Sequence, residues 1–327
     1  AVFAGDRAAE FGARMAGASY EEILASGGGI HSTVRATREA SFVDLIEQSV
    51  GRIRRMLQAG TTTAEVKTGY GLDVDTEVKM AAAINAIGLS VPIDLVPTFL
   101  GAHVIPPEYA NDRKAYVALV TGEMLDAVSG HVANIDVFCD EAAFTVEEAR
   151  AVLTAGRDRE LGLRIHAEQL ARTGGAALAA ELGAVSADHL DHATDEDLSI
   201  LAAAGTAAVL LPGVSYAMRA PQPDASRIWD SGVTVAIATD CNPGTAWIET
   251  MPYVVSLAVV QAGLAPDRSL WAATRGGAEA LGLDDRGWLR QGAIGDLVVL
   301  DAPSHQHLAY RPDGDLVTAV VKAGSRV

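Results

Sequence analysis

The sequence predicts an α/β protein that combines a (β/α)8 barrel of the TIM type with a small composite β-sandwich. Short apolar segments recur along the chain, and segments with helical periodicity separate them. Spacings of about 20–40 residues leave room for the helical crossover that parallel strands require. Towards the C-terminus the pattern changes to short strands with Gly and Asp-Gly turns, as in a small antiparallel unit. We therefore expect a barrel domain in residues 1–283 and the C-terminal part of a sandwich in residues 284–327.

The barrel is expected to begin with helices and to continue with strands. Residues 7–59 are mostly helical in pattern, around a Gly27-Gly28-Gly29 loop. No Gly-Lys-Ser/Thr follows this loop, so we interpret it as a turn and not as a phosphate-binding loop. The predicted strands are Thr61–Lys67, Ile93–Phe99, Ile135–Cys139, Leu163–Ala167, Val185–Leu190, Ala207–Leu211 and Thr234–Thr239. Seven strands are one short of a closed barrel, and the absent one would precede Ala1.

Two helices between the strands have clear ends in the sequence. Val146–Leu161 follows Thr145, and Glu148 completes a capping box with that threonine. Asp195–Ala204 stops at Gly205, a residue type that commonly ends helices. The sequence therefore predicts helical crossovers between successive strands.

The composition limits the classes of function. Of 327 residues, 49% are hydrophobic and the mean hydropathy is +0.19, so a large buried core is expected. The net charge of −17 argues against nucleic acid and anionic lipid as partners, and an anionic substrate would need local positive charge. No apolar run is long enough to span a membrane. Cys139 and Cys241 form no disulfide framework, which suits a reducing cytoplasm.

Three predicted strands end in side chains that suit catalysis. His166 lies in RIHAEQ, His189 lies in SADHLDH, and Asp240 follows the apolar strand that ends at Thr239. Active sites of barrels lie at the carboxyl ends of the strands. Taken singly, a buried histidine is more often a hydrogen-bonded core residue than a ligand, and Asp240 is as readily the cap of a helix or turn. As a set they favour a Zn²⁺ or Fe²⁺ site that keeps an open position for water.

Nine motifs in order resemble the imidazolonepropionase family of the metal-dependent amidohydrolase superfamily. They are VFAGDR, GGGIHSTVRATR, TTTAEVKTGYGL, PTFLGAHVIPPEY, IDVFCDEAAF, RIHAEQL, SADHLDH, LLPG and ATDCNPGT. The resemblance covers essentially the whole chain. It implies a (β/α)8 barrel with a composite β-sandwich, one Zn or Fe ion, and a homodimer. It also implies the third step of histidine degradation, in which water opens 4-imidazolone-5-propanoate to N-formimidoyl-L-glutamate.

The resemblance implies roles for ten residues. It makes His166 and Asp240 metal ligands, and it makes His189 and Asp240 catalytic groups near the metal-bound water. The other positions match contacts with substrate or product, namely Arg7, Tyr70, His103, Gln169, Asn242, Gly244 and Thr245.

Some of these assignments agree with independent chemistry. The propanoate needs a cation, and the Arg7 guanidinium can fork onto a carboxylate. Without the resemblance, Arg7 reads as a solvated charge at a helix start and Tyr70 as part of a plain turn. His103 follows a strand end, where it would contact an anion or a ring.

The chain departs from the family pattern in two places. The His-x-His pair of the first barrel strand would fall immediately before Ala1, so the sequence contains half of the expected ligand set. Gln169 stands where some relatives have Glu, and an amide hydrogen-bonds but transfers no proton, so proton transfer falls to Asp240 and His189. Because residues 135–139 offer no Lys or His before Cys139, we expect one metal ion and not two.

Two other functions remain open from the sequence. One is a related cyclic amidohydrolase, or an aminohydrolase that deaminates a nitrogen heterocycle on the same metal framework. The other is a barrel without metal that serves as a binding or structural subunit. We also expect the natural polypeptide to continue upstream with sandwich strands, the first barrel strand and its histidine pair. Residues 1–327 alone should then be poorly soluble, nearly metal-free and inactive.

Overall fold

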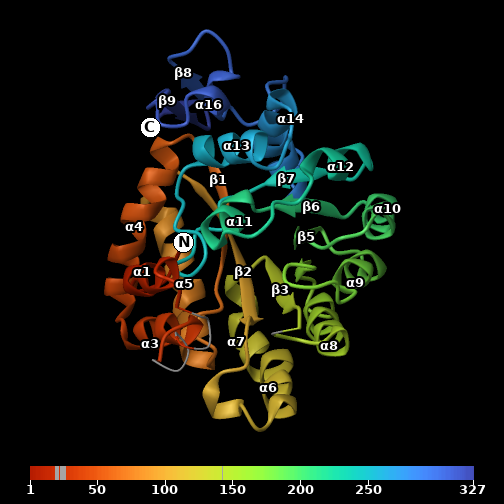
Figure 1. Cartoon of the computed structure of the whole chain (residues 1–327). Coiled ribbons are helices and arrows are strands. Elements are labelled where there is room, and N and C mark those ends of the chain that lie inside the picture. Colours follow the sequence, from red (N-terminus) through yellow and green to blue (C-terminus); the bar gives the residue numbers. More distant parts are fainter. Residues whose placement is uncertain (19–21, 23–26, 142) are drawn as a thin grey trace.

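The computed structural model describes residues 1–18, 22, 27–141 and 143–327, and its centre is a curled sheet of seven parallel strands. Each strand pairs with the next along the chain (Figure 1). The strands are β1 (Thr63–Lys67), β2 (Asp94–Ala102), β3 (Asn134–Cys139), β4 (Gly162–Ala167), β5 (Ser186–His189), β6 (Ala207–Leu210) and β7 (Val235–Ile237). Among the described residues, β1 and β7 are the two edges of this sheet.

Some of the described helices pack on the outer side of the sheet, and others lie at its ends or beside the C-terminal residues (Figure 1). They are α1 (Ala8–Met15), α3 (Ile30–Glu39), α4 (Phe42–Gln58), α5 (Val74–Ser90), α6 (Arg113–Leu119), α7 (Leu125–Val128), α8 (Val146–Arg157), α9 (Gly175–Leu182), α10 (Asp195–Ala204), α11 (Pro212–Met218), α12 (Ala225–Asp230), α13 (Met251–Val260), α14 (Pro266–Trp271), α15 (Gly277–Ala280) and α16 (His307–Tyr310). The main core lies between the helices and the outer face of the sheet, where Phe99, Ile135, Ile165 and Val235 are buried. No helix among the described residues is long and apolar enough to cross a membrane.

The seven predicted strands are confirmed, with shifts of a few residues at their ends. The largest extension is in β2, which continues past Phe99 to Ala102 through an irregularity in its pairing with β3. The most shortened strand is β7, where the backbone leaves the ladder before Thr239. These runs are predictable because strands of a covered parallel sheet are apolar on both faces and read as continuous hydrophobic segments.

The predicted start of the helix at Val146 and the predicted end of the helix at Ala204 are confirmed. Thr145 Oγ accepts a hydrogen bond from Glu148 N at 3.2 Å, and the Glu148 carboxylate accepts from Thr145 N at 2.9 Å. This helix, α8, ends four residues before the predicted end, at Arg157. Gly205 ends α10 with φ of +73°, a conformation that glycine adopts without steric cost.

The N-terminal region is helical as predicted where the structure describes it. It contains α1, α3 and α4, and residues 19–21 and 23–26 of the predicted helical range lie outside the described residues. The glycine loop is a turn, and Gly29 precedes α3 with φ of +79°. The first residues of the chain are buried, and the Ala1 amino group donates to the carbonyl oxygen of Cys241 at 3.0 Å. The chain thus begins beside the carboxyl end of β7.

The C-terminal residues form a small antiparallel sheet at one end of the molecule (Figure 1). Its strands are β8 (Leu297–Leu300), β9 (Val317–Lys322) and β10 (Ser325–Arg326), in the order β10-β9-β8. Lys322 Nζ ties this sheet to the barrel through Asp94 Oδ2 at 2.7 Å. The predicted antiparallel unit is therefore confirmed. The completed sandwich and the domain boundary at residue 283 stay predictions.

Candidate active site

All ten residues singled out in the sequence line one cavity of about 1350 Å³. The cavity extends along the inner face of the sheet, from residues 59–63 before and at the start of β1 to the carboxyl ends of the strands, where barrel enzymes hold their reactive groups. The lining includes Arg7, Tyr70, His103, His166, Gln169, His189, Asp240, Asn242, Gly244 and Thr245. Residues from distant parts of the chain therefore share one space.

Three imidazoles gather at the centre of this cavity. The His166 ring centroid lies 5.2 Å from that of His189 and 6.5 Å from that of His103. His166 Nδ1 lies 3.0 Å from Asp136 Oδ1. Because a carboxylate only accepts, Nδ1 carries the hydrogen, and in the neutral ring Nε2 keeps its lone pair. Burial lowers the pKa of His166, but the adjacent Asp136 carboxylate outweighs it and raises that pKa above its ordinary value.

His189 is held at the end of β5 in a strained backbone conformation. Its φ is +76° and that of Leu190 is +62°, values that are uncommon for residues with a side chain. His189 Nδ1 is buried and has no hydrogen-bond partner among the described residues. Burial, and then the positive charge of neighbouring His166, lower the pKa of His189 well below its ordinary value. The ring is therefore neutral at pH 7 and has one nitrogen free to donate a hydrogen bond.

Asp240 follows β7 with a φ of +44°, also in the left-handed region. Burial raises the pKa of its carboxyl group above the ordinary value, and the positive charges of His166 and Lys67 oppose that rise. No described residue donates a hydrogen bond to this carboxylate. A carboxyl group whose pKa is raised towards neutrality is suited to accept and release a proton.

The loop after Asp240 is folded by the Asn242 side chain. Its Oδ1 accepts hydrogen bonds from Gly244 N at 2.9 Å and Thr245 N at 2.8 Å, and its Nδ2 donates to the Asp240 carbonyl oxygen at 2.7 Å. A Cβ added at Gly244 would lie 2.3 Å from Arg7 Nη1. Glycine at this position therefore lets the Arg7 guanidinium approach the loop.

Arg7 stands at the start of a helix, and its side chain also lines the cavity. It precedes α1 as the capping residue, and its side chain is 15% exposed and lines the cavity. Nε pairs with Glu10 Oε2 at 2.7 Å. Arg7 is thus a helix-start charge whose terminal nitrogens lie against the loop of residues 242–245.

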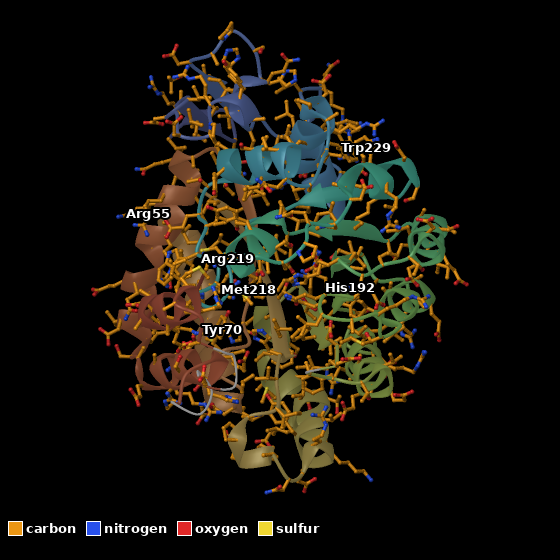
Figure 2. The ribbon with its side chains drawn as sticks, viewed as in Figure 1. Arg55, Tyr70, His192, Met218, Arg219 and Trp229 are labelled. Atoms are coloured by element: carbon orange, nitrogen blue, oxygen red, sulfur yellow. The ribbon has the colours of Figure 1, made fainter. Side chains whose placement is uncertain are left out.

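The Tyr70 loop is built around a buried carboxylate, that of Glu77. Its oxygens accept hydrogen bonds from Gly69 N at 3.1 Å, Gly71 N at 2.8 Å and Leu72 N at 2.9 Å. Tyr70 lies beside the N-terminal helices and toward the middle of the molecule (Figure 2), with its ring 5.4 Å from that of His103. His103 Nδ1 contacts Gly69 O at 2.9 Å, and burial lowers the pKa of His103 to about 4. The loop is therefore an ordered part of the cavity wall and not a plain surface turn.

Gln169 and His192 also line the cavity. Gln169 N and Leu170 N donate to Asp140 Oδ2 at 3.0 and 2.9 Å, so the end of β3 holds the loop that carries Gln169. His192 is exposed (Figure 2).

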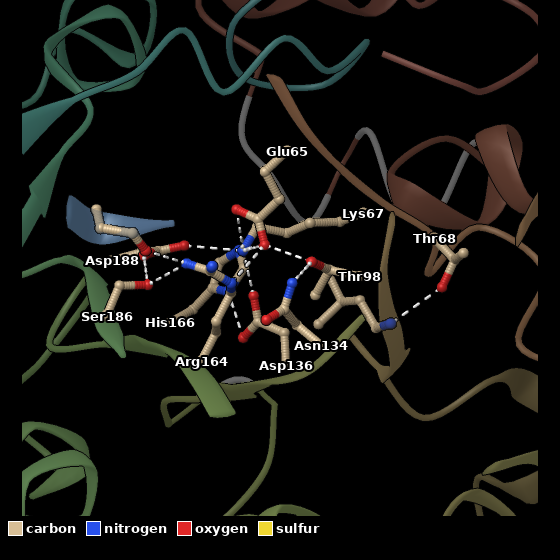
Figure 3. Close-up of polar contacts among 12 residues, drawn as sticks. Glu65, Lys67, Thr68, Thr98, Asn134, Asp136, Arg164, His166, Ser186 and Asp188 are labelled. Carbon is tan, nitrogen blue, oxygen red and sulfur yellow. Dashed lines mark hydrogen bonds and ion pairs between the residues drawn. The ribbon is translucent and has the colours of Figure 1, made fainter. Parts of the chain in front are cut away.

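Below these residues lies a layer of paired charges that sequence reasoning missed (Figure 3). Lys67 Nζ lies 2.5 Å from Asp136 Oδ2, 2.9 Å from Asp188 Oδ2 and 3.2 Å from Glu65 Oε2. Arg164 Nε lies 3.0 Å from Glu65 Oε1, and Arg164 Nη1 donates to Ser186 Oγ at 3.0 Å. The available signal was the presence of charged residues inside apolar strand patterns. We name these five residues, Glu65, Lys67, Asp136, Arg164 and Asp188, the charged layer.

The structure offers metal-binding side chains in two overlapping arrangements. Ligand atoms of Asp136, His166 and Asp188 lie within 4.8 Å of one another, and all three residues are buried. Asp240 is not a member of that group, although it lies in the same cavity and interacts electrostatically with His166. The lone pair on His166 Nε2 and the unbonded Asp240 carboxylate are donors that fit a Zn²⁺ or Fe²⁺ ion. The expectation of a single metal ion was based on the lack of Lys and His in residues 135–139. It did not consider the carboxylate of Asp136 on that strand.

Known proteins match this chain along its length. Residues 47–327 match the family described as "Amidohydrolase family". An imidazolonepropionase of Streptomyces avermitilis is 51% identical over 326 residues, which cover 100% of this chain and 76% of that protein. An imidazolonepropionase of Streptomyces coelicolor is 49% identical over 325 residues, which cover 99% of this chain and 80% of that protein.

Solved structures with lower identity share the fold. N-isopropylammelide isopropylaminohydrolase from Burkholderia multivorans has a TM-score of 0.71 at 19% identity, covering 90% of this chain and 77% of that one. An adenosine deaminase from Xanthomonas campestris with bound zinc has a TM-score of 0.66 at 21% identity, and the match covers 88% of this chain and 70% of that one.

Proposed function

Because the chain belongs to the imidazolonepropionases of the amidohydrolase family, we propose that it hydrolyses 4-imidazolone-5-propanoate to N-formimidoyl-L-glutamate. The observation that carries this proposal is the 51% identity to an imidazolonepropionase across the whole chain. The gathering of all ten expected residues around one cavity supports it. The heterocycle aminohydrolases enter only as likenesses of fold, so the ring-opening reaction is favoured over deamination.

We propose that one Zn or Fe ion is held by His166 Nε2 and the Asp240 carboxylate, with further ligands completing the site. The Asp136 contact supports this role for His166, because it leaves Nε2 as the nitrogen with a lone pair. When bound, such an ion lowers the pKa of a water molecule and polarises the ring carbonyl.

The reaction itself adds water to a ring carbonyl and breaks its bond to nitrogen. Asp240 accepts a proton from the attacking water, a role that its raised pKa suits. Neutral His189 donates a hydrogen bond to the oxygen on which negative charge develops. The proton held by Asp240 then passes to the departing ring nitrogen. The new carboxylate keeps the oxygen of the water, and the nitrogen leaves within the formimidoyl group.

The cavity wall provides groups for the rest of the substrate. Arg7 would pair with the propanoate, and its position against Gly244 and Asn242 supports this role. Tyr70, His103 and Gln169 would orient the ring, and the Asn242–Thr245 turn would hold the product through Asn242, Gly244 and Thr245. Gln169 would act through hydrogen bonds alone, because its amide transfers no proton.

The resemblance to the family also supports two coarser proposals. We propose that the protein works as a homodimer in the cytoplasm. We also propose that residues 1–283 act as the catalytic barrel and that residues 284–327 belong to a small sandwich. The net charge of −17 supports the absence of nucleic acid and anionic membrane among its partners.

The proposal is tested by offering the purified, metal-supplied full-length polypeptide two kinds of substrate. We expect consumption of 4-imidazolone-5-propanoate with stoichiometric formation of N-formimidoyl-L-glutamate, followed by mass spectrometry. Amino-substituted purines and pyrimidines should release no ammonia. Ammonia from such a heterocycle, with imidazolonepropanoate untouched, would transfer the assignment to the deaminases.

A further inference from the structure

Lys67 occupies an unusual place in the cavity, in contact with two members of a buried group that could bind a metal ion. Asp136, His166 and Asp188 place ligand atoms within 4.8 Å of one another. Two donors each about 2.1 Å from one ion lie at most about 4.2 Å apart, so a small shift would bring these atoms into range. The Lys67 ammonium lies 2.5 Å from Asp136 Oδ2 and 2.9 Å from Asp188 Oδ2 (Figure 3). A cation supplied by the chain thus already pairs with both carboxylates.

Asp136 connects this cation to the proposed metal ligand. One of its oxygens, Oδ1, contacts His166 Nδ1 at 3.0 Å, and the other, Oδ2, contacts Lys67 Nζ. The Asp136 side chain is fully buried, so the protein must satisfy both oxygens. With Oδ2 held by Lys67, Oδ1 remains available for the Nδ1–H of His166. The ring is then fixed with Nε2 as its lone-pair nitrogen.

We propose that Lys67 is a positioning residue that acts on His166 through Asp136, and that its ammonium keeps the Asp136–Asp188 pair from binding a second divalent ion. This inference rests on the proposed function in one respect, which is the assignment of His166 Nε2 to the metal ion. The chain therefore builds a one-ion centre by placing its own cation where a second ion would bind.

Charge explains why a single side chain has this effect. The charged layer holds the three carboxylates of Glu65, Asp136 and Asp188 against two cations, Lys67 and Arg164. Without Lys67, the three carboxylates would face Arg164 alone, which leaves an excess of two negative charges. Buried charges without partners are strongly unfavourable, and a divalent cation would neutralise this excess.

The first test replaces Lys67 and counts bound ions. The Lys67→Met variant and the unsubstituted protein, both made as the full-length polypeptide, are dialysed against Zn²⁺ or Co²⁺, and the bound metal is measured by elemental analysis. We expect one ion per chain in the unsubstituted protein and two in Lys67→Met, with a second Co²⁺ absorption component. One ion in both proteins would overturn the inference and leave the proposed function standing. No ion in either protein would overturn both.

Lys322 provides a matched control within the same chain. Its Nζ also lies between two carboxylates, 2.7 Å from Asp94 Oδ2 and 2.7 Å from Asp296 Oδ2, but this pair lies where the start of β2 meets the small sheet, and neither carboxylate contacts His166. Arg286 still pairs with Asp94 when Lys322 is replaced. The Lys322→Met variant should therefore keep the unsubstituted stoichiometry. A second ion in this variant would show that loss of any lysine held between two carboxylates has the same effect, which would contradict the inference.

A second pair of variants tests the contact with His166 and does not depend on the folding of Lys67→Met. Asp136→Asn and Asp188→Asn each remove one carboxylate beside Lys67, but only Asp136 contacts His166. We expect Asp136→Asn to weaken binding of the first Zn²⁺ about 10–100-fold, measured by competition with a chelating dye. Asp188→Asn should leave that affinity within about threefold. Equal losses of Zn²⁺ affinity in the two variants would show that Lys67 and Asp136 only balance charge in the cavity. That result would overturn the positioning role.

Discussion

The cavity has two levels, which differ in how their polar side chains are paired. The upper level lies at the carboxyl ends of the strands, and the lower level is the charged layer. At the carboxyl ends of the strands, His189 Nδ1 and the Asp240 carboxylate have no hydrogen-bond partner among the described residues. In the charged layer below, Lys67 alone contacts three carboxylates at 2.5 to 3.2 Å. Arg164 Nη2 in the charged layer is also buried without a hydrogen-bond partner among the described residues, but its guanidinium is paired with the Glu65 carboxylate. Because an unpaired buried polar group is costly, we interpret His189 Nδ1 and the Asp240 carboxylate as groups that are available to a ligand. The difference separates groups that meet the substrate from groups that hold the site.

The backbone shows the same division. Non-glycine residues with positive φ follow β4, β5 and β7, at Glu168, His189, Leu190 and Asp240. Each such conformation is unfavourable by about 1–3 kcal/mol and persists where surrounding structure enforces it. The residues of the charged layer have ordinary strand conformations. Four of the eight described non-glycine residues with positive φ thus lie at the level where we place the chemistry, and the other four are Leu72, Glu160, Arg219 and Ala323.

Substitution of His189 should show the clearest difference between the roles of the two levels. His189→Ala removes a group that we assign to the transition state, so kcat should fall by about 10²–10⁴-fold while bound metal and thermal stability change little. His166→Ala or Asp240→Ala should lose both turnover and most of the metal. Steady-state kinetics and elemental analysis of the three variants measure this difference. Normal metal content in both ligand variants would contradict their assignment.

Arg164 should show the reverse behaviour. It is 1% exposed and pairs with Glu65, so Arg164→Met leaves the half-buried Glu65 carboxylate with its weaker contact to Lys67 at 3.2 Å. We expect the free energy of unfolding to fall by about 3–5 kcal/mol, measured by urea denaturation, while the folded fraction keeps most of its kcat. The exposed pair Arg150–Glu181 is the control, since Arg150→Met should change stability little. A kcat loss as large as that of His189→Ala, without loss of stability, would place Arg164 among the reacting groups.

Arg7 tests whether the upper level also recognises the acid chain. Arg7→Ala should raise KM for the substrate about tenfold to a hundredfold, because a bidentate charged contact contributes about 1.5–3 kcal/mol. The loss should be much smaller for an imidazolone that lacks the propanoate. Equal losses on the two compounds would return Arg7 to the role of a helix-start charge.

A smaller effect of pH is expected from Asp191, which lines the same cavity. Burial raises the pKa of Asp191 to about 6, although Ser215 Oγ donates to it at 3.1 Å. The folded protein therefore holds this proton more tightly than the unfolded chain, whose carboxyl pKa is about 3.9. Stability should fall by up to about 3 kcal/mol as pH rises from about 4 to about 6. Asp191→Asn should remove this part of the slope in denaturation series, and an unchanged slope would contradict the assignment.

The sequence predicts the sheet and the upper level better than the charged layer, for a physical reason. Buried parallel strands are continuous apolar runs, and His166, His189 and Asp240 stand at or just after such runs. The charged layer depends on contacts across the barrel. Lys67 meets Asp136 and Asp188 over separations of 69 and 121 residues, which no local pattern reveals.

The Arg7 and Tyr70 environments were also beyond local patterns. A turn and a helix start look ordinary in sequence, and only the folded chain places Arg7 against Gly244 and wraps the Tyr70 loop around Glu77. The resemblance to a family supplied these two residues, and the structure supplies their surroundings.

The most direct test of the whole account is turnover in water enriched with heavy oxygen. We predict that 4-imidazolone-5-propanoate gives N-formimidoyl-L-glutamate with one heavy oxygen atom, located in the carboxylate formed from the ring carbonyl. The His189→Ala and Asp240→Ala variants should give almost no labelled product under the same conditions. Product without label in that carboxylate, or release of ammonia in place of ring opening, would contradict hydrolysis by an activated water at the carboxyl ends of the strands.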